Sequence, residues 1–404
     1  MLIKAGLLLD GSGAPPCYDR FIAVENGKIA AVGGEDDFAV EQVERAVDYS
    51  PYTVLPGLID CHVHLFLEGI ADMETRRCRW REGREIMLFR AARNLELTLR
   101  KGVTTVRDLG GPYGIATTLK QAVGKKVLPG PRVLTCHRSI SVPGGHFHYA
   151  GGREASGPEE IAKAVREQTE AGADCVKLMA TGLVDFRTGK AGAPELTKED
   201  IESAVAEARR VGSSVSVHAN GADGVQRALI AQADTIEHGI LMGEKTLDLF
   251  DGSSAYWVPT LSPLRQMLAC GPANPAQPEV GLERIYSGHC ALVRRGIDAG
   301  ADIIAGTDAG SLGVAHGEVW QELALFTALG MSPPDAVQAA TGRAAKAIGV
   351  SDVTGTVEPG KNADLLVVRG NPLRNMSFLR NVIQVYKDGE SILSAARQNQ
   401  EKRR

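Results

Sequence analysis

Metal-binding residue types stand at the carboxyl ends of five apolar runs in this sequence of 404 residues. His62 and His64 lie two positions apart, so in a strand both side chains project to one face and could hold a single ion. The ends of four later runs supply Lys177, His218, His238 and Asp308. A lone histidine in a strand is usually a hydrogen-bonded structural residue. The coincidence of six such residues instead predicts one ligand set assembled from separate strands.

The sequence around these residues predicts strands that are each followed by a helix, and this alternation indicates a parallel sheet. The eight expected strands are Thr53–Leu65, Val103–Leu109, Arg132–Ile140, Asp174–Met179, Ser213–His218, Thr235–Glu237, Trp257–Leu261 and Asp302–Thr307. Apolar residues at spacings of three and four predict helices over Glu85–Arg100, Pro158–Glu170, Lys198–Val211 and Gly317–Leu329. Eight such units match an α/β fold of the (β/α)8 TIM barrel type, whose active site lies at the carboxyl ends of its strands. A doubly wound sheet is the alternative.

Short strand-like runs with turns between them occupy both ends of the chain. The pair Asn26-Gly27 between two such runs predicts a hairpin. Short strand-like runs separated by turns occur again at residues 363–368 and 382–386. We therefore expect one small β-sandwich domain built from both ends. The expected domains are residues 1–53 for the first part of the sandwich, 54–350 for the barrel, and 351–404 for the second part of the sandwich with a C-terminal tail.

The composition excludes several classes of protein. Lys and Arg number 45 against 49 Asp and Glu, a formal net charge of −4, which argues against nucleic acid as a partner. No run approaches the roughly 18 apolar residues of a membrane span, and no secretory signal is recognisable, so we expect a cytoplasmic protein with no membrane partner. The seven cysteines include no Cys-x-x-Cys pair, and the sequence has no serine-hydrolase elbow, phosphate loop, dinucleotide fingerprint or His-Glu-x-x-His motif.

The whole pattern, His-x-His on the first strand with Lys, His, His and Asp ending the fourth, fifth, sixth and eighth, closely resembles the amidohydrolase superfamily. The resemblance spans nearly all 404 residues and includes the phrase from Gly355 to Leu365, which in that superfamily marks the return of the chain to the sandwich. It implies a TIM barrel with an appended β-sandwich. In the binuclear branch it also implies two divalent metal ions, with Zn²⁺ as the expected metal.

Lys177 is the unusual member of this set, because an ammonium group has no lone pair to offer a metal. The resemblance implies that carbon dioxide carboxylates Lys177 and that the resulting carbamate bridges the two ions. It further implies that the more buried ion is held by His62, His64, Lys177 and Asp308, and the exposed ion by Lys177, His218 and His238. An ordinary ion pair with a neighbouring carboxylate is the alternative for Lys177.

Two ions about 3.5 to 4 Å apart would hold a hydroxide between them and polarise a substrate carbonyl. Asp308 is then the expected catalytic general base, which takes the proton of the attacking hydroxide and passes it to the leaving nitrogen. Deaminases of the superfamily usually carry a glutamate three residues after the strand-five histidine and lack the lysine. Here Gly221 stands at that place and Lys177 is present. Hydrolysis of an amide-like bond is therefore favoured over deamination.

The phrases Ser141–His148 and Lys177–Gly182 resemble one branch of the superfamily, which contains imidazolonepropionase-like proteins and the Xaa-Pro and Xaa-Arg/Lys dipeptidases. The expected substrate-binding residues are His146, His148, Arg138 and Tyr256. Hydrogen bonding to the loop backbone is the alternative for the two histidines, and core packing is the alternative for the tyrosine. The arginines at positions 76, 77, 79, 81 and 84 are diluted by glutamates, which predicts a solvated helix face.

The leading hypothesis is a binuclear metal-dependent hydrolase that cleaves the amide bond of a dipeptide or an N-acyl amino acid, most like an Xaa-Pro dipeptidase. A homo-oligomer is expected because relatives commonly assemble. Hydrolysis of a carbamate, a cyclic amide or a xenobiotic amide by the same site is the alternative, because the residues that separate such substrates lie on loops. A barrel that binds small molecules through a vestigial site is a third, non-enzyme hypothesis.

Overall fold

The computed structural model describes residues 1–270 and 279–393 of the chain. The chain forms two compact units, each assembled from separate stretches of sequence. The first unit comprises Met1–Asp60, Glu96–Thr105 and Gly317–Arg404, and the second comprises Cys61–Leu95 and Val106–His316. The domain boundaries expected near residues 53 and 350 stay a prediction.

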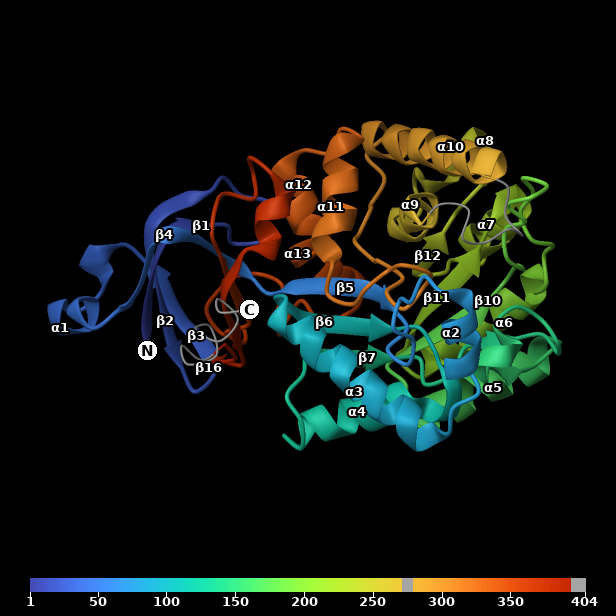
Figure 1. Cartoon of the computed structure of the whole chain (residues 1–404), viewed down its shortest axis with the longest axis horizontal. Helices are drawn as coiled ribbons and strands as arrows, with labels where there is room; N and C mark the ends of the chain where they lie inside the picture. Colours follow the sequence, from blue (N-terminus) through green and yellow to red (C-terminus); the bar gives the residue numbers. More distant parts are fainter. Residues whose placement is uncertain (271–278, 394–404) are drawn as a thin grey trace. The chain divides into compact units, whose positions relative to one another are not determined.

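One sheet of seven strands, in the order β16-β15-β14-β4-β1-β2-β3, organises the first unit. The strands are β1 (Leu2–Leu8), β2 (Cys17–Glu25), β3 (Lys28–Gly33), β4 (Val47–Pro56), β14 (Leu365–Val368), β15 (Val382–Lys387) and β16 (Glu390–Ser391). Asn26 and Gly27, with φ of 50° and 78°, make the tight turn between β2 and β3. Ile3 and Ile22 pack in one core with Leu365. The expectation of a β-sandwich-like module built from both chain ends is confirmed, and Figure 1 shows its blue and red strands.

Parallel strands carry the residues of the expected site, in two further sheets. The larger sheet has the order β13-β12-β11-β10-β8-β9 and the smaller one the order β5-β6-β7. The strands of the larger sheet are β8 (Ile140–Ser141), β9 (Arg153–Glu154), β10 (Cys175–Met179), β11 (Ser214–Ala219), β12 (Thr235–His238) and β13 (Tyr256–Val258). Those of the smaller sheet are β5 (Leu58–Val63), β6 (Val103–Asp108) and β7 (Arg132–Thr135).

Backbone contacts join these two sheets into a closed ring. The segment 303–309 forms parallel bridges with both neighbours, Trp257 to Ile303 and Val63 to Ala309. On the other side, the backbone N–H of Asp174 donates to the Thr135 carbonyl at 2.7 Å. The eight expected strand positions therefore close into an α/β TIM barrel, and a doubly wound open sheet is excluded.

Three of the eight strand predictions are wrong in detail. The run Arg132–Ile140 is divided between β7 and β8, which belong to different sheets. The run Thr53–Leu65 is not one strand but two, because β4 belongs to the seven-stranded sheet and β5 to the barrel. The chain switches sheets at Gly57, where a Cβ would lie 2.1 Å from the Thr104 hydroxyl oxygen. The run Asp302–Thr307 is held by isolated bridges rather than by a strand of several consecutive pairs.

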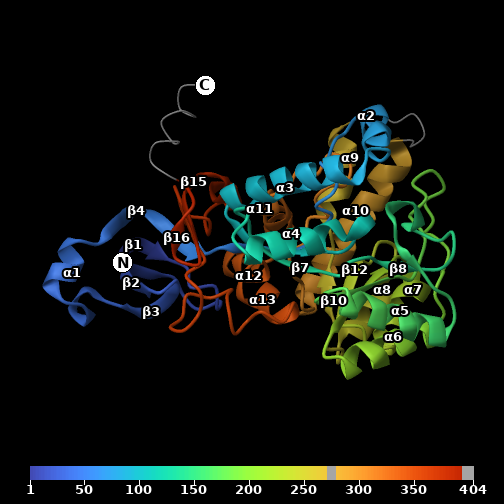
Figure 2. The same cartoon turned by 90° about the horizontal axis from the view of Figure 1, so that it is seen from below.

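The bounds of the four helices predicted from the apolar spacing agree with the structure to within about two residues at each end. The four expected helices are α3 (Arg84–Arg100), α5 (Pro158–Glu170), α6 (Lys198–Arg210) and α11 (Val319–Ala328). In α5, proline opens the first turn and Ile161, Ala164 and Val165 are buried at spacings of three and four. Thr197 and Asp200 form a capping box that starts α6, which packs beside α5 (Figure 2).

The remaining helices are α1 (Val40–Glu44), α2 (Met73–Arg79), α4 (Ile115–Gly124), α7 (Gly221–Ile230), α8 (Glu244–Leu247), α9 (Leu261–Ala269), α10 (Glu279–Asp298), α12 (Pro333–Ala339) and α13 (Gly342–Ala347). The short helix α2 follows β5 and begins at Asp72, whose carboxylate accepts a hydrogen bond from the backbone of Thr75 at 2.7 Å. Within the described part of the chain, no helix combines the length and the apolar character needed to cross a membrane.

Candidate metal centre and active site

His62 and His64 project from the end of β5 with the same tautomer. Nδ1 of His64 donates to the carbonyl oxygen of Gly110 at 2.8 Å, since a carbonyl can only accept. Nδ1 of His62 likewise donates to the Glu237 carboxylate at 2.7 Å. The lone pair of each ring is then on Nε2, and these two atoms lie 3.8 Å and 3.5 Å from the same oxygen of Asp308. Both imidazoles are therefore oriented as metal ligands usually are.

His238, the last residue of β12, has the same orientation. Thr260 donates its hydroxyl proton to the carbonyl of Pro259 at 2.8 Å, so its oxygen accepts from Nδ1 of His238 at 2.7 Å. Strand alternation would send Glu237 and His238 to opposite faces, but His238 has a φ of +68°. This left-handed backbone at the strand end allows both side chains to contribute to one site.

Asp308 completes the group, and its own φ is +54°. One ligand atom from each of His62, His238 and Asp308 lies within 4.8 Å of the others. Two imidazoles and a carboxylate are a donor set that suits zinc and related divalent ions. The structure therefore brings three of the six expected metal ligands into a group that could hold a metal ion.

Lys177 projects from the middle of β10 and is 1% exposed. Its Nζ has no hydrogen-bond partner among the described residues. Burial lowers the pKa of this ammonium group to about 8. The ordinary ion pair considered for Lys177 is absent from the part of the chain that the structure describes. The nearby Glu237 carboxylate instead accepts from Arg107, Thr235 and His62.

The fourth and fifth imidazoles, His218 and His146, continue the row formed by the first three. The ring centroid of His218 lies 4.7 Å from that of His238 and 4.5 Å from that of His146. Nε2 of His218 accepts from the Asn220 amide at 3.2 Å, and the oxygen of the same amide accepts from the backbone of Ile240 at 3.0 Å. His218 therefore lies beside the group formed by His62, His238 and Asp308, with its ring held by the loop after β11.

All five imidazoles are held neutral. Burial, reinforced by the charge of Lys177, keeps the pKa of His62 well below its usual range. Burial is also the main cause that lowers the pKa of His64 to about 3 and that of His146 to about 4, and it keeps the pKa of His218 and His238 well below the usual range. Neutral rings retain the lone pair that a metal needs.

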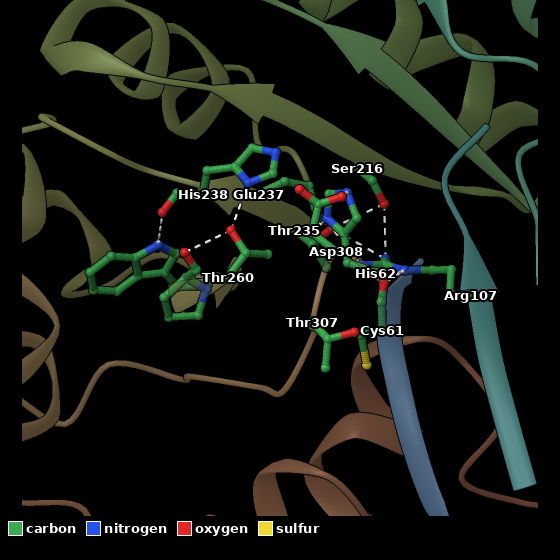
Figure 3. A network of polar contacts seen from close by, with 12 residues as sticks. Cys61, His62, Arg107, Ser216, Thr235, Glu237, His238, Thr260, Thr307 and Asp308 are labelled. Atoms are coloured by element: carbon green, nitrogen blue, oxygen red, sulfur yellow. Dashed lines mark hydrogen bonds and ion pairs between the residues drawn. The ribbon is translucent and has the colours of Figure 1, made fainter. Parts of the chain in front are cut away.

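A buried ion pair beneath the group fixes the orientation of His62 (Figure 3). Nη2 of Arg107 donates to Oε1 of Glu237 at 2.9 Å, and Oε2 of the same carboxylate accepts from His62. Arg107 also donates to the Cys61 carbonyl at 2.7 Å and to the Ser216 hydroxyl at 2.8 Å. Arg107 and Glu237 are 1% and 0% exposed. Their contacts satisfy a charged pair that would otherwise be costly to bury.

The candidate site opens into a cavity of about 290 Å³. All six expected metal ligands and His146 line this cavity. The other three expected substrate residues do not. Nδ1 of His148 binds the Gly145 carbonyl at 2.7 Å on the surface, and Arg138 donates to two loop carbonyls. Tyr256 starts β13, opposite the first residue of β12 and so at the far end from His238. A substrate role for these three residues stays a prediction.

Three functional candidates were not expected from the sequence, namely Arg107, Glu237 and Arg76. A signal existed for the first two, because Arg107 and Glu237 are opposite charges within apolar strands, and a charge buried in a barrel needs a partner. The solvated helix face predicted for the arginines is wrong for Arg76, which lines the cavity. Met73, Arg76 and Trp80 follow the spacing of three and four that places residues on one face of a helix.

Comparison with known proteins agrees with this geometry. The profile of the amidohydrolase family matches residues 53–392, and the chain therefore belongs to that family. The solved structure of a Xaa-Pro dipeptidase with methionine bound in its active site is 32% identical, with a TM-score of 0.88 over 96% of this chain and 98% of that one. The ochratoxinase of Aspergillus niger is 27% identical over 428 residues, which is 96% of this chain and 86% of that protein.

The imidazolonepropionase of Geobacillus kaustophilus is 26% identical over 379 residues, covering 85% of this chain and 82% of that protein. The resemblance inferred from the sequence motifs is thus confirmed at the level of the family and its branch. The protein is an amidohydrolase with a His/Asp group that could hold metal.

Proposed function

We propose that the protein is a binuclear metal-dependent hydrolase that cleaves the amide bond of a dipeptide or an N-acyl amino acid. The ions are two divalent cations, with Zn²⁺ as the proposed metal. The proposed ligands are His62, His64, Lys177, His218, His238 and Asp308. All six line one cavity, which supports a single shared centre.

The observation that carries the proposal is the buried amine of Lys177, which lacks a hydrogen-bond partner among the described residues while neutral imidazoles surround it. Burying a polar group without a hydrogen-bond partner costs free energy, so we expect a further chemical group to bind or modify the Lys177 amine. Addition of the neutral amine to carbon dioxide forms an N–C bond and releases one proton, which gives a carbamate. The carbamate offers two oxygens in place of an ammonium that cannot bind metal.

The histidines support the same reading, because they are preorganised as ligands before any ion binds. His62, His64 and His238 each use Nδ1 to donate to a protein oxygen, which leaves the Nε2 lone pair at the site. Fixing the ring in this way is the usual contribution of the groups behind a metal-binding histidine. The donor set of imidazoles and carboxylates suits Zn²⁺.

When bound, the two ions would supply Lewis-acid activation of water and of the substrate carbonyl. Asp308 is the proposed catalytic base, because its carboxylate lines the cavity and lies beside His62 and His64. It would accept the proton of the attacking water and donate it to the leaving nitrogen. His146, which lines the cavity beside His218, is proposed to orient the substrate carbonyl.

An amino-acid product is supported by the likeness to the Xaa-Pro dipeptidase, whose active site holds methionine. Hydrolysis of a carbamate, a cyclic amide or a xenobiotic amide is the second candidate. This second candidate is supported by the likeness to an ochratoxinase and by the apolar residues that line much of the cavity, such as Phe186 and Leu264. A homo-oligomer also stays a prediction, which sedimentation of the purified protein would test.

Two measurements test the proposed function. Protein purified with zinc supplied should contain about two zinc ions per chain, and protein without bound metal would contradict the proposal. A panel of dipeptides ending in Pro, Arg or Lys, N-acyl amino acids, carbamates and cyclic amides then separates the two candidates. Turnover of dipeptides or N-acyl amino acids is expected, and turnover of carbamates or cyclic amides alone would refute the dipeptidase assignment.

A substitution at Lys177 connects activity to the proposed centre. Lys177→Met keeps an unbranched side chain that is one atom shorter and removes the amine, so we expect zinc content and turnover to fall together. Lys245→Met removes the same charge from an exposed position in α8 and is the matched control. Equal zinc content in the two variants would count against a ligand role for Lys177.

A further inference from the structure

The charges that line the catalytic cavity are few and unequally placed. Among the described residues that line it, the only lysine and the only arginine are Lys177 and Arg76, and the only carboxylate belongs to Asp308. Much of the remaining lining is apolar, including Met73, Phe186 and Leu264. If Lys177 and Asp308 serve the metal centre, Arg76 is left as the charged group that faces a substrate.

Arg76 is fixed close to the loop that carries Asp308. Its Nη1 donates to the carbonyl of Gly310 at 2.7 Å, two residues beyond Asp308. The backbone N–H of Ser311 in turn donates to the Asp308 carbonyl at 2.9 Å. One of the five N–H donors of the guanidinium therefore holds it beside the proposed metal centre, and the other four can bind a ligand.

Neighbouring arginines have carboxylate partners that Arg76 lacks. Arg79 pairs with Glu68 at 2.6 Å, and Arg90 pairs with Glu68 at 2.7 Å and with Glu82 at 2.6 Å. Within residues 1–270 and 279–393, Arg76 forms no ion pair with an aspartate or a glutamate. A half-buried guanidinium without a carboxylate partner can bind a planar anion through two parallel hydrogen bonds.

An aromatic wall connects the helix of Arg76 to the metal ligands. Trp80, on the same face of α2 as Arg76, has its ring centroid 4.7 Å from that of Tyr149. Tyr149 is followed by Phe147 at 5.9 Å, and Phe147 by His64 at 4.9 Å. A ligand held by Arg76 would therefore place its remaining groups against apolar and aromatic surface, which favours large uncharged side chains.

We propose that Arg76 binds the α-carboxylate of the substrate, and that the substrate is an N-acyl or N-aminoacyl derivative of a large apolar α-amino acid. This proposal rests on the proposed amide hydrolysis at the same centre. In such a compound, one carbon atom separates the carboxylate from the scissile nitrogen. Arg76 donates to Gly310, two residues beyond Asp308, which places the guanidinium near the proposed centre. A basic leaving residue is disfavoured, because its side chain would meet the apolar wall and the charge of Arg76.

A matched pair of substrates tests the carboxylate contact. N-acetyl-L-leucine and N-acetyl-L-leucinamide share the scissile bond and differ only in the negative charge. Zinc-loaded full-length protein should hydrolyse the acid with a kcat/KM about 10- to 100-fold above that for deacetylation of the amide, as expected for one charge-assisted contact. Nα-acetyl-L-lysine should be a poorer substrate than N-acetyl-L-leucine. Equal kcat/KM values for the acid and the amide would overturn the proposal.

Substitution of Arg76 assigns the preference to this residue. Arg76→Met should remove the preference by lowering kcat/KM for the acid, chiefly through KM, while the amide is little affected. Arg76→Lys should retain part of the preference for the acid, because an ammonium charge replaces the planar guanidinium group. Arg77→Met removes the same charge from the adjacent, exposed position and should keep the wild-type ratio. An Arg76→Met protein that retains the wild-type ratio would refute the assignment.

Calorimetry separates this proposal from the proposed function. L-leucine should bind the zinc-loaded wild-type protein at least about 10-fold more tightly than L-leucinamide, and Arg76→Met should abolish that difference. If neither acetyl compound is hydrolysed, the proposed amide hydrolysis fails, while the calorimetric difference still decides whether Arg76 is a carboxylate site. Equal binding of the two ligands to the wild-type protein would contradict the site whatever the enzyme does.

Discussion

Replacement of Glu237 by glutamine tests the buried pair beneath the metal group. The carboxylate accepts from Arg107 at 2.9 Å and from Thr235 at 2.5 Å through one oxygen, and from His62 at 2.7 Å through the other. Glutamine keeps the shape but has one accepting oxygen, so either Arg107 or His62 must face an amide donor. Arg107, 1% exposed, also loses its counter-charge.

Removing one partner of a buried ion pair costs about 3–5 kcal/mol, and we expect Glu237→Gln to lower the free energy of unfolding by that amount. The assay is urea unfolding of the metal-free protein followed by circular dichroism. The matched control is Glu244→Gln, because Glu244 pairs with Arg295 at 2.6 Å while both side chains are about half exposed or more. Exposed pairs contribute about 0–1 kcal/mol, so the control should be nearly neutral.

The same variant should also bind zinc more weakly, because His62 loses the acceptor that fixes its tautomer. A loss of about 10- to 100-fold in affinity, measured by competition with a chelator, is the expected size of such an effect. If Glu237→Gln is no less stable than Glu244→Gln and binds zinc equally well, the pair neither supports the barrel interior nor orients His62.

Three further predictions concern the centre and the barrel. Asp308→Asn should retain zinc while losing most turnover, and activity within about tenfold of wild type in a steady-state assay would contradict the role of general base. Lys177→Ala should lose turnover and regain part of it when a small carboxylate such as acetate is added, because that anion can supply the missing oxygens; an absence of rescue at any acetate concentration would argue against the carbamate. Gly306→Ala should destabilise the protein by about 1–3 kcal/mol in urea unfolding, because the new Cβ would lie 2.4 Å from Val258 and 2.8 Å from the Cβ of His62. A Gly306→Ala protein as stable as wild type would show that these strands can separate without cost.

Much of the barrel could be predicted from the sequence because its elements have strong local signals. The helix Pro158–Glu170 is opened by a proline and has buried residues at helical spacing, and its predicted bounds match α5. The sheet switch at Gly57 could not be predicted in the same way, because only this one residue separates the apolar end of β4 from the start of β5. It depends on the approach of Thr104, which is distant in sequence.

The candidate site could be predicted where chemistry and strand position coincide, as for His62 and His64. It could not be predicted where tertiary geometry decides. His238 and Asp308 were predicted as ligands from their residue types and positions, but the positive φ of each residue has no signal in the sequence. Arg76 was obscured because four other arginines lie within eight residues of it, and only the fold shows which of the five faces the cavity.

The central claim is that Lys177 is carboxylated and joins two metal ions. The most direct test is a crystal structure of the protein purified with zinc and bicarbonate, with anomalous data collected at the zinc edge. The account predicts continuous density for a carbamate on Nζ of Lys177 and two anomalous peaks among His62, His64, His218, His238 and Asp308. An unmodified lysine with no anomalous peak in this cavity would contradict it.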